Sequence, residues 1–222
     1  MTNRTAIRTA ILAAGLLLAV AAPSMRAAEI VRYDFSNGLA PTSTAPTVTA
    51  LPVGFGAFNE SRLPADRGHS RAYQGNLFAR VKSTANGLPL LLVPTAEGAV
   101  AAETFFTITL KATGDAPVQL GQFSAKIGAQ KIGSDAIADY TIHCFLRSSA
   151  DNFQSGLGKF SYLKKNSSGG CTYADNPWTV DLDKLSVPAG SPLTFRLYLY
   201  VETDTPDHNQ SVRIDDISIT SK

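Results

Sequence analysis

The sequence predicts an all-β protein, folded as a two-sheet antiparallel β-sandwich of the jelly-roll kind with about nine or ten strands. Three observations predict it. Apolar and polar residues alternate in short segments, no window of about 11 residues shows a convincing helical period, and clusters of Gly, Pro, Asn and Ser separate the segments. Hydrophobic residues make up 44% of the 222 residues and charged residues 17%, which excludes a disordered chain.

The clearest strand runs from Leu193 to Val201, where five apolar residues alternate with Thr194, Arg196, Tyr198 and Tyr200. Such a strand has one face in a core and the other toward solvent or a ligand. The same reasoning predicts strands at 31–35, 77–82, 88–93, 106–110, 118–127, 140–146, 160–163, 178–182 and 212–219. The Thr- and Pro-rich segment 41–52 is predicted as an extended surface loop.

The alternation slips by one residue in the last strand. Val212 and Ile214 share one parity, whereas Ile217 and Ile219 have the other. A slip inside a continuous apolar strand indicates a β-bulge, which would re-aim Asp215 and Asp216.

The N-terminus has the order of a secretory signal peptide. Arg4 and Arg8 precede an apolar run that ends at Ala22, and the small residues Ala27 and Ala28 follow. The run is shorter than the roughly 20 residues of a membrane span. We therefore divide the chain into a signal peptide, 1–28, and a single β-sandwich domain, 29–222, and expect a secreted protein, extracellular or periplasmic.

Removal of the signal changes the charge. It takes away three arginines and no carboxylate, so 17 basic side chains face 18 acidic ones and the formal charge falls from +2 to −1. A chain of this charge has no basic footprint for nucleic acid. No second long apolar segment follows, so we expect no membrane span in the mature chain.

The two cysteines, Cys144 and Cys171, are an even number in an oxidising compartment. A disulfide between them would close a loop of about 27 residues and stabilise the fold by roughly 3 to 4 kcal/mol. Two unpaired thiols are the alternative, because the pair has no characteristic spacing.

Four segments resemble a known kind of domain: VRYDFSNG (31–38), LRSSADNF (146–153), FRLY (195–198) and RIDDISI (213–219). They are similar to jelly-roll domains of exported bacterial proteins of the PEP-CTERM type, which look related to carbohydrate-binding modules. The resemblance spans the whole predicted domain, through short and mostly structural motifs. The sequence departs from the PEP-CTERM pattern in ending at Lys222 without a Pro-Glu-Pro motif, apolar helix and basic tail.

The resemblance implies a structural Ca²⁺ between the first and last strands, at the matching residues Asp34, Asp215 and Asp216. Ca²⁺ takes six to eight oxygen ligands, and adjacent carboxylates at a bulge repel each other unless a cation neutralises them. The alternative is that Asp215 and Asp216 cap turns or pair with Arg213 and Arg32.

A sugar site would need an exposed aromatic ring beside planar polar groups. The candidate ligand-binding residues are Trp178, Tyr173, Tyr162, Asn176 and Asp175, all within or beside a loop-rich segment. For Trp178 the alternative is a core position in the sandwich. Tyr198 and Tyr200 share the polar face of their strand with Arg196. If these two tyrosines do not contact a ligand, they cover the second sheet.

The sequence predicts an exported, non-catalytic binding module, with carbohydrate or a cell-surface glycan as the ligand by resemblance. No Gly-x-Ser-x-Gly, His-Glu-x-x-His or phosphate-loop motif occurs, so we assign no catalytic residue. The first alternative is a structural, matrix or adhesion protein that acts by assembly. An exposed apolar face or a free strand edge would support this alternative. The second is a β-sandwich glycan hydrolase or lyase, which needs a deep cleft with paired acids.

Overall fold

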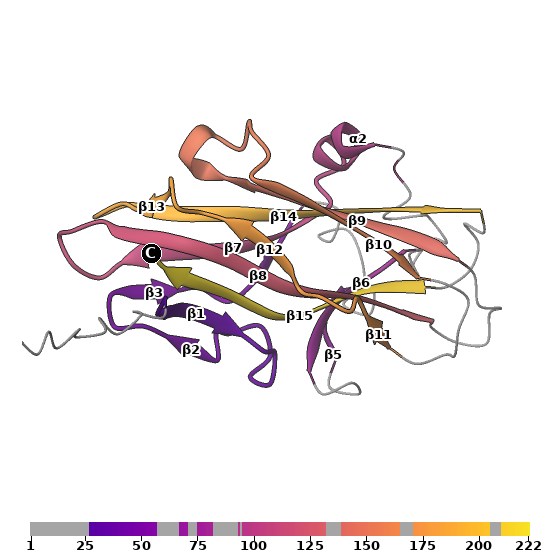
Figure 1. Ribbon diagram of the computed structural model, residues 1–222, viewed down its shortest axis with the longest axis horizontal. Coiled ribbons are helices and arrows are strands. Elements are labelled where there is room, and N and C mark those ends of the chain that lie inside the picture. Colours follow the sequence, from indigo (N-terminus) through magenta and orange to yellow (C-terminus); the bar gives the residue numbers. More distant parts are fainter. Residues whose placement is uncertain are drawn as a thin grey trace, which may run out of the picture.

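The computed structural model describes residues 27–56, 67–70, 75–81, 93, 95–131, 139–164, 171–204 and 210–222. The predicted signal peptide lies outside the described residues except for Ala27 and Ala28. The described chain forms two antiparallel sheets, of nine and six strands, stacked as two layers (Figure 1). The predicted two-sheet antiparallel β-sandwich is confirmed, and its jelly-roll connectivity stays a prediction.

The nine-stranded sheet is built on three strands in the order β8 (Val118–Lys131), β15 (Gln210–Ser221) and β1 (Glu29–Tyr33). Shorter strands extend it: β2 (Ser43–Thr44) beside β1, β6 (Asn76–Arg80) beside β15, β5 (Arg67–Ser70) beside β6, and β11 (Thr172–Tyr173), β12 (Trp178–Asp181) and β13 (Ser186–Val187) along β8.

The six-stranded sheet has the order β10 (Gly158–Lys164), β9 (Tyr140–Ser148), β14 (Pro192–Thr203), β7 (Phe105–Ala112) and β3 (Val48–Ala50), with β4 (Gly54–Phe55) also paired to β7. Every predicted strand that falls on described residues is present, and 88–93 lies outside them except for Val93. The sequence did not indicate β2, β3, β4, β5, β11 and β13, because two to four residues are too few to show an alternation.

The core lies between the inner faces of the two sheets. On β14 the predicted apolar series, Leu193, Phe195, Leu197, Leu199 and Val201, points inward, and none of the five is more than 2% exposed. The nine-stranded sheet contributes buried side chains to the same core: Val31, Tyr33, Phe123, Ile127, Ile214, Ile217 and Ile219. Each such side chain stabilises the fold by roughly 1.5 to 3 kcal/mol when fully buried.

Two core tyrosines keep their hydroxyl groups hydrogen-bonded. Tyr33 donates to the carbonyl of Leu51 at 2.8 Å, and Tyr140 donates to the carbonyl of Ser211 at 3.0 Å. The second bond runs from the six-stranded sheet to the nine-stranded one. Buried hydroxyls are costly when unpaired, so these bonds also fix how the layers lie on each other.

The predicted bulge in the last strand is confirmed. Asp215 pairs with Lys126 of β8, but the next paired residue, Ser218, is opposite Ser124, so β15 carries one extra residue there. Asp216 takes a left-handed backbone conformation, with φ of 48°. The extra residue turns Ile217 and Ile219 back to the core face, where both are fully buried.

A short helix, α2 (Ala96–Ala101), and the 3₁₀ turn after β9 (Ser149–Asp151) were not predicted. The helix is six residues long, too short for an amphipathic period, and Thr95 caps it by accepting a hydrogen bond from the Gly98 amide at 3.1 Å. In Figure 1 both elements rise above the six-stranded sheet, on the side away from the core. The outer face of this sheet is therefore not flat, because α2 and the 3₁₀ turn project from it.

Strand β11 packs directly on a glycine of β8, which gives a test of the fold. A Cβ at Gly128 would lie 2.7 Å from the Thr172 carbonyl oxygen and 2.6 Å from the Tyr173 ring. We expect Gly128→Ala to lower the free energy of unfolding by about 1 to 3 kcal/mol through overpacking, measured by urea denaturation. The control is Gly114→Ala, whose Cβ would meet nothing within 4 Å. Equal stability of the two variants would show that β11 does not pack on Gly128.

Candidate functional site

Trp178 lies in the core and not on the surface. Its side chain falls on the inward face of β12, opposite Ala125 of β8, and is 3% exposed. The indole contacts Phe123 edge to face at 5.3 Å and Phe160 at 6.2 Å between ring centroids. It has no exposed face for a sugar, which corrects the prediction of Trp178 as a ligand platform in favour of its alternative.

The other four predicted ligand residues do not form one surface with it. Tyr162 and Tyr173 are half-buried, and the Tyr162 hydroxyl donates to Thr172 Oγ1 at 3.3 Å, joining β10 of one sheet to β11 of the other. The two tyrosines thus close the edge of the sandwich. Asp175 and Asn176 are exposed in the turn that leads into β12.

The three predicted metal ligands lie near the junction of β1 and β15, and each has at least one carboxylate oxygen in a hydrogen bond or ion pair. Asp216 forms ion pairs of 2.5 Å with both Arg32 and Lys126. Burial raises the pKa of Asp216, but hydrogen bonds from Lys126 and Arg32 outweigh burial and lower it overall. The predicted alternative, pairing of Asp216 with Arg32, is present.

Asp34 and Asp215 also have local partners, and Asp215 Oδ1 accepts from the Asp216 amide at 2.8 Å. Asp34 Oδ1 accepts from the Ser36 hydroxyl and amide and from the Thr42 hydroxyl, and these bonds lower the pKa of Asp34 to about 2. Burial raises the pKa of Asp215. Among the described residues no group of three or more His, Cys, Asp or Glu side chains is arranged to hold a metal ion. Ca²⁺ therefore has no preformed ligand set here and stays a prediction.

Cys144 and Cys171 are not joined by a disulfide. Cys144 points into the core from the middle of β9 and is 2% exposed, whereas Cys171 lies half-buried just before β11 on the other sheet. Burial raises the pKa of the Cys144 thiol well above its usual range. The structure thus corresponds to the alternative of two separate thiols.

The outer face of the six-stranded sheet holds three rows of aromatic and charged side chains, set by the register of its strands. One row is Tyr200, His143 and Ser161, the next is Phe105, Tyr198, Phe145 and Lys159, and the third is Arg196 and Arg147. Each row crosses β14 and β9, so its members are direct cross-strand neighbours and interact across the strands.

In the first row two contacts hold the imidazole of His143. Its ring stacks on Tyr200 at 4.5 Å between centroids, and Nδ1 lies 2.9 Å from the Ser161 hydroxyl. Nε2 lies 3.4 Å from a Glu202 carboxylate oxygen but makes no hydrogen bond to it. Burial, followed by the charges of Glu202 and Glu97, raises the pKa of Tyr200.

The second row is a small hydrophobic cluster on the outside of the sandwich. The Tyr198 ring stacks on Phe145 at 4.7 Å and meets Phe105 edge to face at 5.1 Å, and Ala99 of α2 covers them. Tyr198 is consequently 1% exposed although it belongs to the polar face of β14. It anchors α2 and is not available to a ligand.

In the third row Arg196 and Arg147 lie directly opposite each other. Phe153 contacts both arginines, but through different groups. Its ring centroid lies 3.9 Å from the guanidinium carbon of Arg196, and its backbone carbonyl accepts a hydrogen bond from Arg147 at 2.9 Å. Both Asn152 and Phe153 have left-handed backbones, with φ of 57° and 61°. Asn tolerates this conformation, but at Phe153 it costs about 1 to 3 kcal/mol, so the loop after β9 is strained where it meets the arginines.

A pocket of about 270 Å³ opens between these rows, α2 and the loop after β9. Its polar wall is formed by Glu97, His143, Arg147, Lys159, Ser161 and Tyr200. Convergent polar groups around aromatic rings are typical of small-molecule sites, and the volume suits one sugar ring better than a drug-sized ligand. Of these residues the sequence had indicated only Tyr200, because the others join it through strand register.

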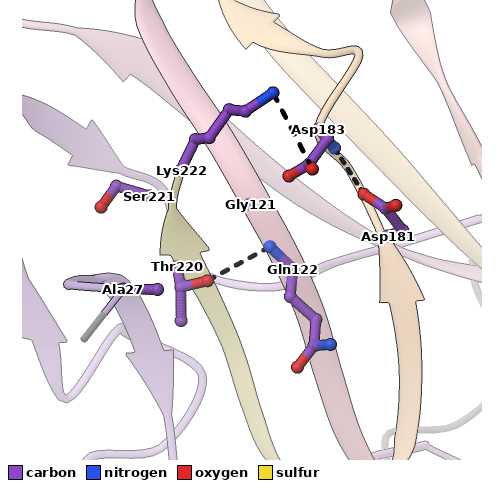
Figure 2. A pocket seen from close by; sticks show the side chains of 8 residues that line it. All are labelled: Ala27, Gly121, Gln122, Asp181, Asp183, Thr220, Ser221 and Lys222. Carbon is purple, nitrogen blue, oxygen red and sulfur yellow. Dashed lines mark hydrogen bonds and ion pairs between the residues drawn. The ribbon is translucent and has the colours of Figure 1, made fainter. Parts of the chain in front are cut away.

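A second pocket, of about 600 Å³, lies at the end of the nine-stranded sheet and is wide open to solvent (Figure 2). Figure 2 shows Lys222 directed toward Asp183 at 3.8 Å, and the Asp183 amide donating to Asp181 at 2.8 Å. Its lining contains no aromatic ring among the described residues. Ala27 forms part of its wall, and cleavage after Ala27 would remove that part, so we take the first pocket as the candidate site.

Chelation tests whether Ca²⁺ or the basic side chains neutralise Asp216. We expect EDTA to leave the melting temperature unchanged, because Arg32 and Lys126 already pair with the carboxylate. Asp216→Ala should lower the free energy of unfolding by about 1 kcal/mol, a figure discounted for the partly exposed pairs, and Asp216→Asn by less, since Asn tolerates a left-handed backbone. Asp175→Asn, at an exposed site, is the control. A fall in melting temperature with EDTA that Ca²⁺ reverses would establish the metal.

Thiol labelling tests the state of the cysteines. In the native protein iodoacetamide should modify Cys171 faster than Cys144, because Cys144 is buried and its pKa is raised. In denaturant without reductant both should react, giving two additions by intact mass. Absence of labelling at both positions until a reductant is added would show a disulfide instead.

Comparison with known proteins gives no family for the chain. No family model and no curated protein matches it. One similar solved structure is the K3 cleaved adhesin domain of Lys-gingipain from Porphyromonas gingivalis, with a TM-score of 0.44 and 15% identity, covering 87% of this chain and 100% of that one. Another is a carbohydrate-binding module that recognises mannan, with a TM-score of 0.41 and 10% identity over 89% of this chain and 99% of that one. Both likenesses are weak and neither indicates a ligand for this chain.

Proposed function

We propose that the protein is an exported, non-catalytic module that binds carbohydrate in the pocket on the outer face of the six-stranded sheet. The observation that carries the proposal is the Tyr200–His143 stack at the wall of a pocket that is also lined by hydrogen-bonding and charged side chains. A sugar presents a C–H face, which packs on a ring, and hydroxyls, which need donors and acceptors beside it.

The pocket supplies both kinds of contact from rigid elements. Tyr200 and His143 come from the two central strands, β14 and β9, and Ser161 comes from β10. The stack and the Ser161 contact hold the imidazole before a ligand arrives, so binding costs little side-chain entropy. Glu97, from α2, also lines the pocket.

Export rests on the predicted signal peptide. In the described part of the chain no helix is long and apolar enough to cross a membrane. Assembly through an apolar face finds little support in the described residues, where Leu51 and Leu163 are the exposed large hydrophobic side chains. Oligomers without glycan affinity would nevertheless favour assembly, and light scattering beside the binding assay detects them.

A polysaccharide pull-down and glycan array test the proposal. Tyr200→Ala should weaken saturable binding about tenfold or more, because it removes the ring that packs on the sugar. Tyr200→Phe keeps the ring and should retain most of the affinity. Trp178→Phe, in the core, should leave binding unchanged if the variant melts as the wild type does. A blank on folded protein, or binding insensitive to Tyr200→Ala, would contradict the proposal.

A further inference from the structure

The basic side chains at the pocket are not neutralised by acidic partners. Among the described residues no ion pair involves Arg147, Arg196 or Lys159, although Arg32, Lys126 and Lys222 form ion pairs away from the pocket. Arg147 Nε is buried without a hydrogen bond, and its guanidinium lies 5.5 Å from the Phe145 ring centroid. Because the Arg147 guanidinium contacts aromatic rings and one carbonyl but no carboxylate, its positive charge can still pair with an anion from outside the chain.

Two arginines directly opposite on neighbouring strands are unfavourable for folding. Like charges at such a position destabilise a sheet, and Arg147 and Arg196 occupy one in the pairing of β9 with β14. The strained Phe153 backbone adds to the cost while holding both guanidinium groups in place. Strain of this kind accumulates at ligand sites, where a ligand offsets it.

A carboxylate of the protein itself marks where an anion is favoured. Glu97, across the pocket, has a lowered pKa, first through hydrogen bonds from its own amide and from Thr95 and then through the charges of Arg147 and Lys159. Both basic residues therefore lie close enough to Glu97 for their charges to favour its carboxylate form. Glu97 is fully exposed and reaches them through charge alone, so a ligand anion that contacts them directly can replace its influence.

We propose that the pocket selects acidic sugars, whose carboxylate or sulfate group pairs with Arg147 and Lys159 while the sugar ring packs on the Tyr200–His143 stack. The inference rests on the proposed carbohydrate-binding function and names the class of its ligand. Arg147 supplies a planar fork that suits a carboxylate or sulfate, and Lys159 supplies a mobile point charge from the edge strand β10. Glu97 opposes the ligand by its own negative charge.

The experiment compares matched acidic and neutral polymers by isothermal titration at about 0.15 M salt, near the physiological value. Polygalacturonate is paired with its methyl ester, and dextran sulfate with dextran, so that each pair differs in charge alone. We expect the acidic member of a pair to bind at least tenfold more tightly, and the preferred pair distinguishes carboxylate from sulfate.

Variants place the effect in the pocket. Lys159→Ala, at an exposed position, should weaken acidic-polymer binding about tenfold, and Arg147→Lys should weaken it although the charge is kept, because the fork is lost. Glu97→Gln should strengthen binding about threefold by removing a competing charge. The control is Lys184→Ala, which removes one exposed charge from the turn between β12 and β13 of the other sheet.

The outcomes separate this inference from the proposed function. Equal binding of neutral and acidic polymers, lost in Tyr200→Ala, would overturn charge selection and leave carbohydrate binding standing. Acidic-polymer binding that Lys159→Ala and Lys184→Ala reduce equally would also overturn it, since the charge effect would then be spread over the surface. No binding of any polymer by folded protein would overturn both.

Discussion

The register of strand β15 is the constraint on which the larger sheet depends. β15 pairs with β1, β6 and β8, and a slip of one residue would turn its apolar side chains from the core to solvent. Its own sequence contains such a slip, and the bulge at Asp216 absorbs it. Arg32 on β1 and Lys126 on β8 form ion pairs with the Asp216 carboxylate from the two neighbouring strands. The bulge is thus held from both neighbouring strands. The first and last strands of the domain, β1 and β15, therefore keep one register.

The smaller sheet uses its two faces for different physical purposes. Its inner face is aliphatic and aromatic, is buried against the other layer and fixes the positions of β9 and β14. Its outer face places rings and cations in rows on those same rigid strands. A site built on central strands keeps its geometry better than one built on loops, because the core beneath resists displacement. The costs of opposed arginines and of a left-handed Phe153 are tolerable only over such a base.

Aromatic residues show how much their role depends on position. Trp178 has the side chain best suited to a sugar, yet it closes the core beside Phe123 and Phe160. Tyr198 and Tyr200 lie two residues apart on the same face of β14, but α2 and two phenylalanines bury Tyr198 and leave Tyr200 at the pocket. Residue type alone therefore did not separate a structural ring from a binding ring.

The sequence by itself determined the all-β fold class, most of the long strands and the bulge at Asp215 and Asp216, because alternation and its slip are local properties of a strand. The tertiary structure decided which residues meet. Tyr200, His143, Ser161 and Arg147 come from three strands and become neighbours only through the register of β9, β10 and β14. Register follows from burial of the whole inner face, which no single segment encodes. For the same reason the burial of Trp178 and the separation of Cys144 from Cys171 emerged only once the sheets were stacked.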